Sequence, residues 1–175
     1  MNSNSFQEDL RYSYTGYDAA IKFLKGYFHS EQVEVINDLA QQKQGIDFKV
    51  ILSDGKEINI DLKMNRADKS TIYLEEYSNR QTGKLGWLLS PDTKTDYYVF
   101  FTPSTGKIII MPHEYALYIY NVVMRLPSLK ENYYHWNTNS LGSFLAIPED
   151  VIPLLAKGFT GKPMEVFSNL FGGEK

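Results

Sequence analysis

Two aspartates and a lysine are the residues of this chain whose types and spacing could support chemistry. Asp61 and Lys63 stand two apart in residues 57–64, where apolar and polar residues alternate as in a strand with one buried face. Their side chains therefore point the same way. Asp47 opens an earlier strand, and an Asp-Gly pair at 54–55 is typical of a tight hairpin turn. The hairpin could bring Asp47 close to Asp61 and Lys63, although the strand register cannot be read from the sequence.

Two clustered carboxylates predict a site for a hard cation. They repel each other unless a cation lies between them, and carboxylate oxygens together with water are the ligands that Mg²⁺ prefers. Lys63 would face the same ion or its substrate. We therefore expect Asp47 and Asp61 to hold Mg²⁺, for which Mn²⁺ can substitute.

The order Ile46-Asp47, hairpin, Asp61-Leu62-Lys63 resembles the PD-(D/E)XK nuclease superfamily. The resemblance covers roughly residues 31–112 and includes a helix before the motif and the strand TIYLEEYSN after it. The segments GWLL and TDYY, at 86–89 and 95–98, are similar to a pattern in uncharacterised phage and bacterial relatives. The chain departs from the family pattern in one position, because Ile46 stands where a proline is usual. The resemblance implies an α/β (α+β) fold with a restriction-endonuclease-like αβββαβ core, in which helices flank a central mixed sheet.

The resemblance also implies a function, which is metal-dependent hydrolysis of phosphodiester bonds by a DNA endo- or exonuclease. Asp47 and Asp61 would be catalytic metal ligands, with the carbonyl of Leu62 as a further ligand. Lys63 would position the attacking water or neutralise charge on the phosphate. Nucleic acid, most simply DNA, is the expected partner, and a homodimer is the arrangement that nucleases of this size use to cut both strands.

Five more residues are candidates for the site. Glu75 and Glu76 are adjacent in a predicted strand, so only one can face the metal; the family pattern favours Glu75, but a register change of one residue would favour Glu76. Asp38, on a predicted helix leading into the first strand, either joins the metal or lies on a solvated face. Arg80 and Lys84, in a glycine-containing loop, are either phosphate contacts or solvated charges.

Length and composition limit the class of protein. The 175 residues fit a single domain, which we divide into a nuclease-like core at 31–112 and a helical and aromatic extension at 113–175 packed on it. No cysteine is present, and the first residues lack the basic-then-apolar order of a secretory signal, so we expect a cytoplasmic protein. No apolar run approaches the ~20 residues of a membrane span. The net charge of −3 argues against a protein that coats nucleic acid, but not against an enzyme.

Hydrophobic spacing predicts the remaining elements. Residues 1–13 are polar and receive no function. We expect helices at 17–28, from Ser30 to Gly45, at 113–125, at 148–157 and at 164–171. Strands are expected at 71–77 and at 141–147, the second of them at a sheet edge, and a buried hairpin at 97–102 and 107–111. Residues 127–138 are expected to form a loop.

Two other interpretations stay open. The first is a non-catalytic protein with the nuclease fold, for example a phage-encoded factor that acts on a host protein. The acidic balance and the absence of a basic stripe favour it. The second is a structural hairpin in which Asp61 and Lys63 form an exposed ion pair, worth roughly 0 to 1 kcal/mol.

Overall fold

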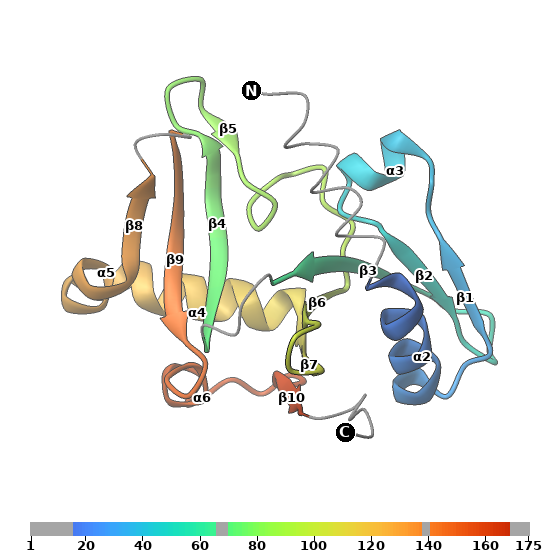
Figure 1. The fold of residues 1–175 in the computed structure, drawn as a ribbon. Helices are drawn as coiled ribbons and strands as arrows, with labels where there is room; N and C mark the ends of the chain where they lie inside the picture. Colours follow the sequence, from blue (N-terminus) through green and yellow to red (C-terminus); the bar gives the residue numbers. More distant parts are fainter. Residues whose placement is uncertain (1–15, 66–69, 138–140, 169–175) are drawn as a thin grey trace.

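Two β-sheets frame the protein in the computed structural model, which describes residues 16–65, 70–137 and 141–168 (Figure 1). Within those residues, sheet A has the strand order β1-β2-β3-β6-β7-β10 and sheet B the order β5-β4-β9-β8. Their bounds are Gln32–Val35 (β1), Phe48–Ile51 (β2), Glu57–Met64 (β3), Thr71–Asn79 (β4), Lys84–Leu85 (β5), Tyr97–Thr102 (β6), Lys107–Pro112 (β7), Tyr134–Asn137 (β8), Gly142–Pro148 (β9) and Glu165–Phe167 (β10). The fold is mixed α and β with a mixed sheet, as predicted.

Short and medium helices connect and cover these sheets. They are α2 (Tyr17–Phe28), α3 (Leu39–Lys43), α4 (His113–Arg125), α5 (Pro127–Tyr133) and α6 (Ile152–Leu155). Helices α2 and α4 have the bounds that their apolar spacing predicts. None of the helices in the described ranges combines the length and apolar character that a membrane crossing requires.

The predicted hairpin is formed by β2 and β3. The two strands pair antiparallel, with Phe48 opposite Ile60. The turn closes where the N–H of Lys56 donates to the Asp54 side chain, and Gly55 adopts a φ of +81°, a conformation that favours glycine. The Asp-Gly signal in the sequence therefore places this turn correctly.

Strand β3 also pairs with β6, and this is the parallel pair that makes sheet A mixed. Its register sets Asp61 beside Tyr98 and Lys63 beside Phe100. The predicted hairpin of β6 and β7 is confirmed, and it lies inside the sheet between β3 and β10.

The two faces of sheet A are buried by different partners. On one face, α2 packs on a cluster that includes Ile60, Leu62 and Val99. On the other face, α4 and the inner side of sheet B share a cluster that includes Tyr98 and Phe100. Because side chains alternate along a strand, Asp61 and Lys63 lie on the second face, at the margin of that cluster.

The segment before the hairpin differs from its prediction. Residues from Ser30 to Gly45 form strand β1 and the short helix α3 in place of one helix. The hydroxyl of Ser30 donates to the Ile51 carbonyl rather than capping a helix, and Val33 and Val35 alternate with exposed residues while β1 pairs with β2. Alternation and an available sheet edge thus prevail over helical spacing here.

The chain after the hairpin differs from its prediction in five further segments. The predicted strand at 71–77 forms as β4, but in sheet B and not in the central sheet. Residues predicted as a loop, 127–138, contain α5 and β8, and this makes β9 an inner strand between β4 and β8 and not an edge. The helix predicted at 148–157 is limited to α6, and the segment at 164–171 contains β10, paired with β7. The expectation for residues 1–13 lies outside the described residues.

Candidate active site

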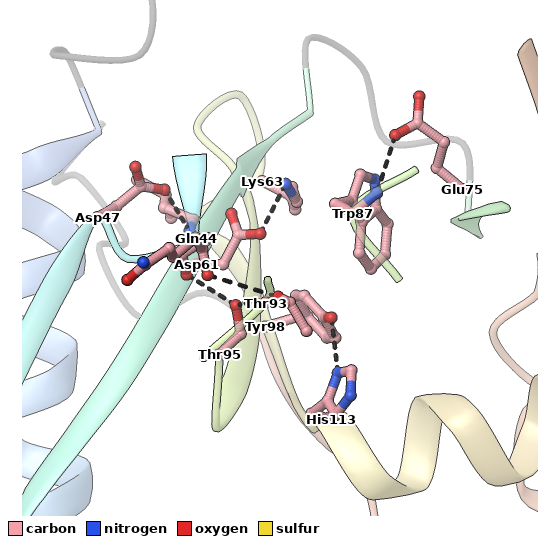
Figure 2. A network of polar contacts seen from close by, with 12 residues as sticks. Gln44, Asp47, Asp61, Lys63, Glu75, Trp87, Thr93, Thr95, Tyr98 and His113 are labelled. Carbon is pink, nitrogen blue, oxygen red and sulfur yellow. Dashed lines mark hydrogen bonds and ion pairs between the residues drawn. The ribbon is translucent and has the colours of Figure 1, made fainter. Parts of the chain in front are cut away.

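Asp47, Asp61 and Lys63 line one cavity, which lies at the end of the β2–β3 hairpin and has a volume of about 290 Å³ (Figure 2). The other lining residues come from α2, from α3 and the turn after it, from β3, and from the segment between β5 and β6. They are Tyr17, Gln42, Lys43, Gly45, Leu62, Trp87, Ser90 and Thr93. The structure thus brings together the three residues that the alternation and the turn predicted to converge.

Asp47 is held where the hairpin ladder ends. Its N–H donates to the Ile60 carbonyl (2.8 Å), and its own carbonyl accepts from the N–H of Ile36 (2.9 Å). The backbone oxygen of Asp47 is therefore turned toward the segment after β1. The side chain points the other way: its Oδ2 accepts a hydrogen bond from the N–H of Leu62 (2.8 Å), which fixes the carboxylate against β3.

Asp61 and Lys63 form an ion pair inside the cavity. Lys63 Nζ lies 2.8 Å from Asp61 Oδ2, and the Asp61 residue is only 4% exposed. The same ammonium lies 4.8 Å from the centroid of the Trp87 ring, within the range of a cation–π interaction. Lys63 is thus held between a carboxylate and an aromatic face, as Figure 2 shows. This pair is partly buried and opens into the cavity, unlike an exposed surface pair.

Burial, with the nearby negative charge of Asp61, raises the pKa of Asp47 from 3.8 to about 6. A hydrogen bond with the Asp61 carboxylate acts in the same direction. The Leu62 N–H and the Lys63 ammonium oppose the shift but do not cancel it. At neutral pH the Asp47 carboxyl, with its pKa of about 6, is mainly ionised, and its repulsion with Asp61 is only partly compensated. The site therefore favours additional positive charge.

A glycine turn brings the backbone close to Asp61. Gly45 has a φ of +74°, and its carbonyl accepts a hydrogen bond from Thr95 Oγ1 (2.7 Å). A Cβ at this position would lie 2.4 Å from Thr95 Oγ1 and 3.4 Å from Asp61 Oδ2. Both conformation and space therefore require glycine, and the turn forms one wall of the site.

A second polar layer lies beneath the ion pair. The Tyr98 hydroxyl and His113 Nδ1 are 2.7 Å apart, and Figure 2 shows both rings on the side of Asp61 away from Asp47, with His113 at the start of α4. Burial raises the pKa of Tyr98, and the charge of Asp61 adds to the shift. Burial lowers the pKa of His113, which favours the neutral imidazole. This layer packs behind the carboxylates and does not line the cavity.

The predicted third acid does not join the pair. Glu75 is on β4, and its carboxylate accepts a hydrogen bond from the backbone N–H of Trp87 (3.2 Å). In Figure 2, Trp87 lies between Glu75 and Lys63. The neighbouring Glu76 points inward instead, where it is buried. Asp38 is exposed and caps α3 by accepting from the N–H of Gln41 (2.9 Å). Neither Glu75 nor Asp38 lines the cavity.

The two predicted phosphate contacts also lie elsewhere. The Arg80 guanidinium lies 4.8 Å from the centroid of the Trp136 ring, beside sheet B. Lys84 is exposed on β5, at the outer edge of that sheet. Leu62, in contrast, does line the cavity, and its N–H is the donor to Asp47.

Sequence reasoning missed other residues of the cavity, above all Gln42 and Lys43 of α3 and Thr93. Lys43 brings a second cation to the site. The signal available for it was its place in the polar run QQKQ directly before Gly45. Because helical spacing predicts the end of a longer helix there, it gives these side chains no direction toward the site.

The donor set fits a magnesium ion. Within the described ranges no group of three or more Asp, Glu or His side chains forms around a common point, so the two aspartates would be the protein carboxylates. Mg²⁺ commonly takes one or two carboxylates and keeps several waters. The raised pKa of Asp47 identifies the uncompensated charge that such an ion would neutralise.

Comparison with known proteins finds no match. No family model matches the chain, and neither the curated proteins nor the solved structures contain a significant match.

Proposed function

We propose that the protein is a Mg²⁺-dependent nuclease that hydrolyses phosphodiester bonds, with a restriction-endonuclease-like core formed around β2, β3 and β6. The observation that carries the proposal is the meeting of Asp47, Asp61 and Lys63 in one cavity that opens to solvent. Two acids supply hard oxygen ligands, and the lysine supplies a cation beside them. The placement of β4 in sheet B sets this core apart from the pattern of its proposed class.

Each residue of the cavity has a role in this proposal. A bound divalent ion supplies Lewis acidity and lowers the pKa of water. Asp47 and Asp61 hold the ion, and the Leu62 N–H keeps the Asp47 carboxylate in position. Lys63 orients the attacking water or neutralises charge that grows on the phosphate oxygens. Lys43 also lines the cavity and adds attraction for the phosphate.

The proposal is tested with end-labelled single- and double-stranded DNA in Mg²⁺, Mn²⁺ and EDTA. Asp61→Asn and Lys63→Met are each expected to reduce metal-dependent cleavage about 100- to 1000-fold, because the first removes a charged ligand of the ion and the second removes the cation that stabilises the transition state. Far-UV circular dichroism checks that both variants fold. Cleavage at the wild-type rate in both folded variants would contradict the assignment.

The same hairpin offers a matched control. Lys49 forms an ion pair with Glu57 (3.0 Å) and does not line the cavity. Lys49→Met therefore removes a lysine from an ion pair on the hairpin, as Lys63→Met does. It is expected to leave cleavage unchanged. Asp38→Asn is the corresponding control for Asp61→Asn, because Asp38 does not line the cavity.

A non-catalytic binding protein is the second candidate, and one observation favours it. Asp61 already forms an ion pair with Lys63 in the described structure. Neither Glu75 nor Asp38 lines the cavity as a third carboxylate ligand for a metal ion. Calorimetry separates the two candidates. Absence of heat on titration with Mg²⁺ and Mn²⁺, together with intact DNA, would support a binding role, with a host or phage protein as the partner.

A further inference from the structure

Trp87 lies between the candidate active site and sheet B, and the proposed mechanism gives it no role. It lines the cavity, and Figure 2 shows its ring beside the Lys63 ammonium, which is 4.8 Å from the ring centroid. The residue belongs to the segment between β5 and β6, which is neither helix nor strand. Such a segment holds a side chain in place only through its contacts, so the contacts of Trp87 decide what it can do.

The Lys63 ammonium needs more than one contact to be fixed in the cavity. A lysine carries a compact charge on a flexible four-carbon stem, so a single ion pair leaves the ammonium free to move around its partner oxygen. The pair with Asp61 Oδ2 (2.8 Å) gives one contact. The Trp87 ring gives a second, and tryptophan is the side chain whose face attracts a cation most strongly. The carboxylate and the ring together define where the charge lies.

The backbone around Trp87 is fixed by β4. The Trp87 N–H donates to Glu75 Oε2 (3.2 Å), and the N–H of Leu88 donates to the Glu75 carbonyl (3.3 Å). The N–H of Gly86 donates to the Glu76 carbonyl (2.7 Å). A Cβ at Gly86 would lie 2.5 Å from Glu75 Cγ and 2.7 Å from the Glu75 carbonyl oxygen, so this close approach requires glycine. Strand β4 thus sets the position of Trp87 from within sheet B.

The ring of Trp87 is oriented by the second polar layer of the site. It contacts the fully buried Tyr98 ring, with centroids 4.5 Å apart and an interplanar angle of 59°. The Tyr98 hydroxyl is in turn 2.7 Å from His113 Nδ1, at the start of α4. Phe100 lies against the same indole more distantly, at 6.5 Å. Buried groups of sheet A and α4 therefore restrict the orientation of the ring that Lys63 contacts.

We propose that Trp87 is the positioning residue for the Lys63 ammonium, and that Glu75 acts on the site through Trp87. The catalytic consequence rests on the proposed nuclease function, in which this ammonium must lie beside the water or the phosphate. Displacement of a reacting group by about 1 Å can lower a rate by up to about 100-fold. The acid on β4 thereby contributes to the site without binding the metal.

The first test measures the contact without cleavage. The full chain in EDTA is acetylated with limiting acetic anhydride, and mass spectrometry of its peptides gives the labelling rate of each lysine. Trp87→Leu is expected to raise the rate at Lys63 about 2- to 30-fold, the factor that corresponds to one cation–π contact, because release from the ring makes the amine available. Lys49, in an ion pair with Glu57 on the same hairpin, is the internal reference and should not change. Trp136→Leu, at the other tryptophan, should leave both rates at their wild-type values.

The second test is a double-mutant cycle on metal-dependent cleavage. Trp87→Leu is expected to lower the cleavage rate about 2- to 30-fold, and Trp87→Phe, which keeps a ring, should restore most of the loss. In a Lys63→Met background, Trp87→Leu should have no further effect, because its partner is gone. A ring that merely fills space would lower cleavage by the same factor in both backgrounds, and that result would overturn the proposal.

Glu75 has a test of its own. Glu75→Gln keeps an oxygen that accepts from the Trp87 N–H, whereas Glu75→Ala does not. Cleavage by Glu75→Gln is therefore expected to exceed that by Glu75→Ala, which should lose about 2- to 10-fold through one missing hydrogen bond. Equal losses in the two variants are the behaviour of a metal ligand and would contradict a role through Trp87.

Failure here is distinguishable from failure of the nuclease proposal. If Trp87→Leu is labelled and cleaves like the wild type, Trp87 does not position Lys63, while the nuclease proposal stands. If the wild type cleaves no nucleic acid but labelling at Lys63 rises in Trp87→Leu, the nuclease proposal fails and Trp87 still holds the ammonium. Far-UV circular dichroism checks the fold of each variant, and Trp87→Met replaces Trp87→Leu if the latter does not fold.

Discussion

At the scale of single residues, Asp47 carries the clearest electrostatic signature of the candidate site. The pKa of its carboxyl rises to about 6 because of burial and the charge of Asp61. The folded protein consequently holds a proton on Asp47 between about pH 4 and pH 6, where the unfolded chain has released it. The stability that this proton supplies is complete at low pH and is lost as the pH rises through 6.

Asp47→Asn should therefore stabilise the metal-free protein at pH 8. An asparagine oxygen can still accept from the Leu62 N–H, while the repulsion with Asp61 disappears. The expected gain in the free energy of unfolding is about 1 to 3 kcal/mol at pH 8, and it vanishes near pH 4. Urea unfolding in EDTA at several pH values measures it. A gain that does not vary with pH would contradict the origin proposed for it.

Glu76 shows the opposite behaviour. The residue is 7% exposed, and its carboxylate accepts from the hydroxyls of Tyr120 (2.7 Å), Tyr134 (2.6 Å) and Ser143 (2.8 Å). Burial alone would raise the pKa of Glu76, but these three donors, with Arg80 nearby, hold it below its usual value. The carboxylate thus stabilises sheet B against α4, and this stability is present above the usual pKa and is lost as the pH falls through the folded value.

Glu76→Gln is expected to destabilise the protein by about 1 to 3 kcal/mol at pH 7, because an amide cannot accept from three hydroxyls as a carboxylate does. The difference from the wild type should shrink in acid. Thermal unfolding at pH 7 and at low pH measures both effects. Glu131→Gln, at an exposed position of α5, is the control and should change little.

The predicted placement of Asp47, Asp61 and Lys63 beside one another is confirmed, and it depends on local pattern. Alternation set Asp61 and Lys63 on one side, and the Asp-Gly turn returned Asp47 to them. The choice between Glu75 and Glu76 depended on long-range pairing, because β4 finds its main partner in β9. No local pattern encodes that partner, so neither glutamate could be excluded from the candidate site from the sequence alone.

At the scale of elements, the turn after α3 controls the shape of the site. Gly45 has a positive φ and no room for a Cβ beside Thr95. Gly45→Ala is therefore expected to destabilise the protein by about 1 to 3 kcal/mol. If the proposed function holds, it also reduces metal-dependent cleavage, since relief of the contact displaces the wall next to Asp61.

Gly55→Ala is the matched control for that change. Gly55 also has a positive φ, but a Cβ there meets nothing within 4 Å. Gly55→Ala adds backbone strain alone, so it should lower the free energy of unfolding by less than Gly45→Ala does. Cleavage by this variant should remain at the wild-type level. Equal losses of activity in both variants would show that the Thr95 contact is unimportant.

Element prediction succeeded where the apolar pattern fits one kind of element and failed where it fits two, or where a distant strand edge decides the outcome. Helices α2 and α4 and the β6–β7 hairpin have strong patterns and were placed correctly. In residues 30–45 the valines fit both a helix and a strand, and the free edge of β2 decided the outcome. The C-terminal strand β10 likewise depends on the edge of β7, which lies far from it in sequence.

At the scale of the whole molecule, α4 connects the two sheets. The core around this helix takes Tyr98 and Met111 from sheet A and Leu74 and Leu145 from sheet B. A shared core of this kind favours cooperative unfolding, because neither sheet can separate without exposing the other.

Ile119→Ala tests that role. Ile119 is fully buried on α4, and its truncation is expected to cost about 2 to 5 kcal/mol. Tryptophan fluorescence and far-UV circular dichroism should still report one common transition at a lower denaturant concentration. Leu154→Ala, at an exposed position on α6, should leave the transition where it was. Separate transitions for the two probes would contradict the shared core.

The pairing of β4 with β9 has a consequence for biosynthesis. As the polypeptide leaves the ribosome, β4 emerges long before β9, and in that interval its other neighbour is the two-residue strand β5. The nascent chain then carries an unprotected edge with alternating apolar and aromatic side chains, a template for misassociation with other chains. Translation that stalls between these strands should therefore yield insoluble material, and a chaperone bound at this stage would protect the edge until β9 arrives.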